Sequence, residues 1–141
     1  MSPEERDAFL AAERVCRVAT VKRDGSPHVA PLWFVWDGTA LWLNSIVRSQ
    51  RWTDLAHQPR VSVVVDAGDD YHELRGVEIS GSAEAVGDVP RSPTPDRALE
   101  TVEHLYASKY SGIEEFRPDD RHAWLRVTAM KIVSWDFRKL R

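Results

Sequence analysis

The run Arg48-Ser49-Gln50-Arg51 is the part of the sequence best suited to bind a ligand. It follows an apolar strand pattern and begins a helical pattern, so it lies where backbone N–H groups are free and point outward. The helix dipole favours an anion at this end, and a serine there caps the helix. The two arginines add planar forks that bind phosphate through paired hydrogen bonds. The run predicts a phosphate-type anion site, with a solvated basic turn as the alternative.

The sequence favours no other catalytic centre. The five histidines, at positions 28, 57, 72, 104 and 122, lack metal-binding spacing, and the single cysteine, Cys16, lies among apolar residues, where a buried thiol is usual. No glycine-rich phosphate loop or serine hydrolase motif is present. An anion site beside tryptophan-rich strands, without a nucleophile, suits a bound redox cofactor that brings its own chemistry.

Length and composition indicate the kind of protein that carries this site. The chain has 141 residues, 43% of them hydrophobic, which predicts one compact domain over 1–141. Its net charge of −3 argues against nonspecific nucleic-acid binding. One cysteine excludes an internal disulfide and fits a reducing compartment. No apolar stretch of about 20 residues exists, so we expect a cytoplasmic protein without a membrane segment.

The first half of the chain predicts a helix, a strand meander and a second helix. Ser2 and Glu5 form a capping-box pattern for a helix ending near Glu13. Asp-Gly turns separate the next strands, because glycine accepts the positive φ of tight hairpins. The expected strands are Val15–Val21, His28–Trp36, Ala40–Asn44 and Val61–Val65, with a helix over Ser49–Gln58 before the last.

The second half predicts two long strands around one more helix. A strand over Leu74–Val86 contains Gly76 and Gly81, which mark bulges or corners. A proline-rich connector follows, and Thr94-Pro95 should begin a helix that ends at Ser111-Gly112. The last strand covers Ala123–Trp135. The pattern favours a mainly β fold, a small antiparallel barrel with helices packed outside.

The strand His28–Trp36 is apolar on both faces. Trp33 and Val35 point to one side, and Phe34 and Trp36 point to the other. One face can be barrel core, whereas the other needs a helix, a flat ligand or a second subunit to cover it.

Six short motifs follow one another along the chain: Arg17-Val18-Ala19-Thr20-Val21, Asp24-Gly25-Ser26-Pro27-His28-Val29, Leu41-Trp42-Leu43, Arg48-Ser49-Gln50-Arg51, Pro59-Arg60-Val61-Ser62-Val63 and Ser134-Trp135-Asp136-Phe137-Arg138-Lys139-Leu140. In their order and spacing they resemble the split β-barrel flavin and deazaflavin oxidoreductases of the pyridoxamine 5′-phosphate oxidase-like superfamily. The resemblance implies a six-stranded antiparallel Greek-key split barrel. It also implies a homodimer with cofactors in the clefts between the subunits.

The same resemblance implies the cofactor-binding residues by position. Arg51 matches the basic phosphate ligand, which is lysine in many relatives, with Arg48, Ser49 and Gln50 around it. The strand that lines the ring in relatives falls on Ala30, Pro31 and Trp33, and Asn44 and Ser45 fall near the ring or the ribityl chain. Trp135 and Arg138 match residues that reach the partner subunit's cofactor in some relatives.

The resemblance is to the compact branch that uses coenzyme F420, with flavin mononucleotide (FMN) as the alternative cofactor. It implies hydride transfer to a conjugated small molecule such as an enone or a quinone. The chain lacks the longer C-terminal segment of true pyridoxamine phosphate oxidases, and no catalytic residue is assigned; Tyr71 and His72 are the only loop candidates for a proton donor. A cofactor-binding protein without turnover and a heme-binding relative are the competing hypotheses.

Overall fold

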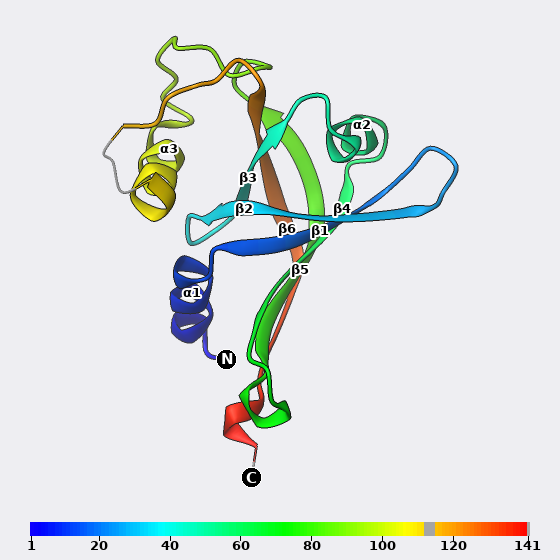
Figure 1. The fold of residues 1–141 in the computed structure, drawn as a ribbon, viewed down its shortest axis with the longest axis vertical. Helices are drawn as coiled ribbons and strands as arrows, with labels where there is room; N and C mark the ends of the chain where they lie inside the picture. The colour runs from blue at the N-terminus through cyan, green and yellow to red at the C-terminus, as the bar shows by residue number, and fades with distance from the viewer. Residues whose placement is uncertain (112–114, 141) are drawn as a thin grey trace.

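In the computed structural model, which describes residues 1–111 and 115–140, six antiparallel strands form a closed barrel (Figure 1). The order around the barrel is β1-β2-β3-β6-β5-β4. The strands are β1 Val15–Val21, β2 Pro27–Trp36, β3 Leu41–Ile46, β4 Arg60–Ala67, β5 Arg75–Val86 and β6 His122–Asp136. The helices are α1 Pro3–Ala12, α2 Gln50–His57 and α3 Glu100–Tyr106, with short helical turns η1 Tyr71–Glu73, η2 Ala107–Ser111 and η3 Phe137–Lys139. The predicted mainly β barrel with outer helices is confirmed.

The first helix and the meander form where local sequence signals place them. The Ser2 hydroxyl accepts a hydrogen bond from the Glu5 backbone N–H at 3.1 Å, and the Glu5 carboxylate accepts from the Ser2 N–H at 3.1 Å. This capping box starts α1, which buries Phe9 and Leu10 against the barrel core. β1, β2 and β3 then pair in sequence as antiparallel neighbours, as a meander requires.

The two faces of β2 pack into two different clusters. Phe34 and Trp36 point into the barrel core, whereas Val35 packs outside the barrel with Trp42 and Trp124. Apolar residues of α3 cover this outer cluster, so a helix supplies much of the cover that the second face needs. Trp33 stays 46% exposed and stacks on the ring of Tyr110, with centroids 4.3 Å apart and planes 7° apart.

The long strands β5 and β6 need glycine at the two predicted positions. A Cβ on Gly76 would lie 2.4 Å from Cζ2 of Trp135, because the indole ring lies directly over this glycine. A Cβ on Gly81 would lie 2.0 Å from the Thr128 carbonyl oxygen, and the β5–β6 register shifts between Ser80 and Gly81. The predicted irregularity is therefore confirmed at Gly81, where the extra residue lies on β6, whereas β5 and β6 keep their register at Gly76.

α3 begins at Glu100, so the prediction that Thr94-Pro95 starts this helix was wrong. The Thr94 carbonyl accepts a hydrogen bond from Nη1 of Arg91 at 2.7 Å, which holds it in the connector. The Asp96 carboxylate accepts from the Ala98 N–H at 3.0 Å and forms a turn before the helix. After Tyr106 the chain continues as a π-helical turn, η2, and the predicted stop at Gly112 lies outside the described residues.

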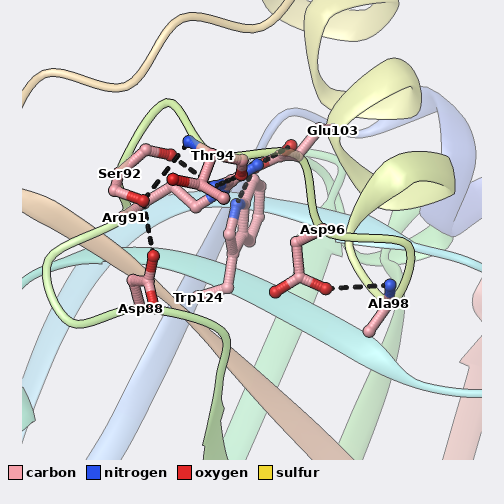
Figure 2. Close-up of polar contacts among 8 residues, drawn as sticks. All are labelled: Asp88, Arg91, Ser92, Thr94, Asp96, Ala98, Glu103 and Trp124. Atoms are coloured by element: carbon pink, nitrogen blue, oxygen red, sulfur yellow. Dashed lines mark hydrogen bonds and ion pairs between the residues drawn. The ribbon is translucent and has the colours of Figure 1, made fainter.

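The buried Arg91 guanidinium joins the proline-rich connector to α3 and β6 (Figure 2). Its Nε donates to Oε2 of Glu103 at 2.7 Å, and its Nη2 donates to Oε1 at 3.0 Å. The Trp124 indole N–H donates to the same carboxylate at 2.9 Å. A bidentate ion pair of this kind gives the buried guanidinium a counter-charge. Arg91, Glu103 and Trp124 are called the Arg91 cluster below.

Candidate cofactor site

The predicted anion site lies where β3 ends and α2 begins. Ser49 is the N-cap of α2, and its hydroxyl accepts a hydrogen bond from the Trp52 backbone N–H at 3.1 Å. Trp52 packs against the barrel core on the inner face of the helix. The capping role predicted for Ser49 is therefore confirmed, and the first turn of α2 is fixed at one end of the barrel.

Arg51 extends from this turn into the protein and not into solvent. Its residue surface is only 8% exposed, and its Nε donates to the Ser45 hydroxyl at 3.2 Å. Ser45 is fully buried, and its Oγ lies 3.4 Å from the Oγ of Ser49. Residues Ser45, Ser49 and Arg51 are called the Arg51 cluster below.

The Arg51 charge has no acidic partner among residues 1–111 and 115–140. None of the ion pairs in this part of the chain includes it, and burial lowers the pKa of its guanidinium from the ordinary value. Burial of an ion without a counter-charge costs free energy. A bound anion would remove that cost, so the Arg51 cluster has the charge and the hydroxyl groups that suit a phosphate.

A buried carboxylate holds α2 in place beside the Arg51 cluster. Asp54 is 2% exposed, and it accepts hydrogen bonds from the Thr20 hydroxyl at 2.7 Å and from the Gln50 amide at 2.6 Å. Burial alone would raise the pKa of Asp54, but these two hydrogen bonds outweigh it and the pKa lies below its ordinary value. Sequence analysis missed Thr20 and Asp54. The available signal was a carboxylate on the inner, apolar face of an amphipathic helix.

The other residues predicted to lie near the phosphate are not part of the Arg51 cluster. Arg48 is exposed, and Gln50 uses its amide on Asp54. Asn44 points to the opposite face of β3 from Ser45, because successive strand residues alternate. It lines a cavity of about 250 Å³ with Tyr106 and His122, and its Oδ1 is buried without a hydrogen-bond partner in the described part of the chain.

The strand predicted to line the ring has an open edge. β3 pairs only with residues Phe34–Trp36 of β2, so β2 from Pro27 to Trp33 has β1 on one side and no strand paired on the other within the described residues. Pro31 is exposed here, in register with Arg17 of β1. Ala30 is partly buried and Trp33 is exposed on its Tyr110 stack. The backbone of this segment is accessible to a ligand or another chain.

Trp135 and Arg138 lie away from the Arg51 cluster within one subunit. Figure 1 shows η3 at the far end of the long β5–β6 ribbon from α2. Trp135 packs over Gly76, and the Arg138 guanidinium donates to Asp136 through Nε at 2.9 Å and Nη2 at 2.8 Å. Tyr71 is exposed in the same tip, with its ring centroid 5.0 Å from that of Phe137.

Across residues 1–111 and 115–140, no group of three or more His, Cys, Asp or Glu side chains could hold a metal ion. No helix in these same residues has the length and apolar character needed to cross a bilayer.

The barrel order is that of a six-stranded split barrel. The chain belongs to the pyridoxamine 5′-phosphate oxidase family, whose sequence model matches residues 2–136. No curated protein sequence matches it.

Solved structures share the fold over nearly the whole chain. The conserved hypothetical protein Rv2991 from Mycobacterium tuberculosis is 33% identical with a TM-score of 0.82, and the match covers 99% of this chain and 88% of that one. An F420 reductase is 23% identical with a TM-score of 0.65, and coverage is 90% and 94%. A heme binding protein from Mycobacterium smegmatis is 16% identical with a TM-score of 0.72, and coverage is 98% and 59%. The last two identities show a shared fold alone.

Proposed function

We propose that this protein is an oxidoreductase that uses coenzyme F420 to transfer a hydride to a conjugated small molecule such as an enone or a quinone. The observation that carries the proposal is the buried Arg51 guanidinium, which lacks an acidic partner among the described residues and has two serine hydroxyls beside it. When bound, the deazaflavin supplies the hydride chemistry. The residues of the chain bind and orient the cofactor and exclude water.

Arg51 suits the phosphate of a ribityl phosphate chain. Its Nη groups form no ion pair within the described residues, and a phosphate would supply the missing negative charge. The Ser45 and Ser49 hydroxyls lie close enough to share in binding that anion. FMN presents the same type of phosphate, so this cluster alone does not separate the two cofactors. We propose the deazaflavin because the sequence motifs resemble the branch that uses F420, and an F420 reductase is among the proteins that share the fold.

We also propose that this protein forms a homodimer, with its cofactors between the subunits. Support comes from the open edge of β2 and from the apolar side chains beside it, with Val29 66% exposed and Trp33 46% exposed. An exposed strand edge of this kind is a surface on which a second chain can pack. A partner placed there would cover the ring-shaped part of the cofactor and keep water from it.

No side chain of the Arg51 cluster can act as a general acid or base near neutral pH. Arginine stays protonated and the serines have no adjacent base in the cluster. Catalysis would therefore depend on orientation and water exclusion. The proton needed by a reduced acceptor would come from solvent.

The test is a titration of the apoprotein with coenzyme F420, FMN and hemin, followed by fluorescence and absorbance. We expect F420 to bind most tightly, and reduced F420 to be oxidised only when an enone or quinone is added. Arg51→Ala should weaken F420 binding by about 1.5–3 kcal/mol, and the exposed-site control Arg48→Ala should weaken it less. Tight FMN binding with no F420 binding, a Soret band, or F420 binding without acceptor-dependent oxidation would each contradict the proposal.

A further inference from the structure

A second cavity, of about 340 Å³, lies between the end of α1, the end of β2 and the α3–η2 segment. Most of its lining residues are apolar, and two cationic residues lie at one end. The wall includes Ala12, Val35, Trp36 and Leu105, and the cationic end is formed by Arg14 and Lys109. No acidic residue lines it in the described part of the chain. Pockets of about this size bind small organic molecules.

Lys109 brings a positive charge to this cavity and forms no ion pair with a carboxylate among residues 1–111 and 115–140. Its Nζ donates to the backbone carbonyls of Leu10 at 3.2 Å and Phe34 at 3.3 Å, and it lies 3.8 Å from the centre of the Phe34 ring. All three contacts are to uncharged groups. Burial, the largest effect, lowers the pKa of this amine to about 8. The neighbouring Arg14 charge acts in the same direction, whereas Cys16 and the Glu13 carboxylate act in the opposite direction.

Lys109 donates to two backbone carbonyls, so Arg14 is the residue of this cavity with N–H groups left to bind a ligand. Its Nη1 donates to the Lys109 carbonyl at 3.1 Å, and its guanidinium lies 5.0 Å from the centre of the Tyr110 ring. It forms no ion pair with the described acidic residues, and its side chain is exposed at the cavity. Glu13, the nearest acid in sequence, lines a different cavity with Met1 and Phe9.

We propose that this cavity binds a small amphipathic monocarboxylate, an aryl or short acyl acid, with the carboxylate on Arg14 and the apolar body against Trp36 and Leu105. The guanidinium fork matches a carboxylate, and the Lys109 charge adds attraction without a direct contact. A phosphate compound fits less well, because every other wall residue is apolar or carries at most one hydroxyl. None of the residues that line the cavity belongs to the Arg51 cluster.

The test uses 4-phenylbutyrate as the probe and 4-phenylbutyramide as its uncharged match, with tryptophan fluorescence and calorimetry as readouts. We expect saturable binding of the acid, at least tenfold weaker binding of the amide, and proton uptake on binding at pH 8, because a nearby carboxylate returns the proton to the Lys109 amine. Equal binding of acid and amide would overturn the proposal.

Variants locate the site. Arg14→Gln should weaken the acid at least tenfold, and Ala12→Trp, which fills the cavity, should abolish binding. The matched control Arg23→Gln, at an exposed arginine in the β1–β2 turn, should bind the acid like the wild type. Arg51→Ala should also bind normally, so a failed cofactor proposal leaves this one intact. Unchanged binding in Arg14→Gln and Ala12→Trp, or loss in Arg51→Ala, would refute it.

Discussion

Arg51 and Arg91 are buried to nearly the same extent, 8% and 6% exposed, but differ in how their charges are neutralised. Arg91 has a bidentate pair with Glu103, which raises the pKa of the guanidinium. Arg51 has one serine hydroxyl, and burial lowers its pKa. The Arg91 charge has its counter-charge within the chain, whereas the Arg51 charge has none among the described residues.

The difference separates a structural charge from one available for binding. A buried ion with a full set of partners holds its elements together, and removal of one partner leaves the other uncompensated. A buried ion without a counter-charge costs stability until a ligand supplies one. Burial of an arginine is therefore not a sign of function by itself. The missing counter-charge is the informative observation.

The largest effect is expected in the Arg91 cluster. Glu103→Gln leaves the Arg91 charge without its carboxylate, and the free energy of unfolding should fall by about 3 kcal/mol or more. Urea denaturation measures this. Glu100→Gln, an exposed acid on the same helix, is the control and should change stability by less than about 0.5 kcal/mol. A loss below about 1 kcal/mol would mean that the ion pair is not structural.

A smaller effect is expected from Thr20→Val, which tests the placement of Arg51 separately from its charge. The substitution removes one of the hydrogen bonds to buried Asp54 and should cost about 1.5–3 kcal/mol at pH 7. Because those bonds lower the pKa of Asp54, their contribution is present above the ordinary aspartate pKa and is lost as pH falls. The difference between variant and wild type should therefore shrink below about pH 4. A difference independent of pH would contradict this role for Asp54.

Arg51→Met should show the opposite behaviour to Glu103→Gln. Without ligand, the free energy of unfolding should stay within about 1 kcal/mol of wild type or rise, because an uncompensated charge is removed. Inorganic phosphate should raise the thermal midpoint of the wild type and leave that of the variant unchanged. Destabilisation by more than about 3 kcal/mol would place Arg51 among the structural charges with Arg91.

The smallest effect concerns Lys109, which like Arg51 forms no ion pair with the described acidic residues. Its pKa of about 8 lies below the ordinary value of 10.5, so above pH 8 the unfolded chain holds more protons than the folded one. Stability should rise by a few tenths of a kcal/mol between pH 8 and 9 relative to Lys109→Met, allowing for screening of a half-buried group. Parallel pH profiles for the two proteins would contradict the lowered pKa.

The features that sequence could predict are those with local causes. The α1 capping box, the Asp-Gly turns of the meander and the Ser49 cap of α2 each depend on residues a few positions apart. The two apolar faces of β2 follow from strand alternation. Each of these was confirmed because tertiary contacts agree with the local preference.

The features that sequence could not predict depend on distant partners. The Asp54 carboxylate meets a hydroxyl 34 residues away, and α3 starts late because Arg91 binds the Thr94 carbonyl and pairs with Glu103. Sequence placed Arg51 at the right helix end, but its burial and its lack of an acidic partner emerged only from the barrel around it. The cofactor roles of Asn44, Trp135 and Arg138 remain predictions.

The most direct test is a thermodynamic cycle between Arg51 and the cofactor phosphate. Binding of coenzyme F420 and of its deazaflavin core without the phosphate is measured by fluorescence for wild type and Arg51→Ala. If Arg51 holds the phosphate, the substitution weakens F420 by roughly 10- to 150-fold and the core by less than about twofold, a coupling of about 1.5–3 kcal/mol. Equal weakening of both ligands, or of neither, would contradict the assignment of Arg51 as the phosphate ligand.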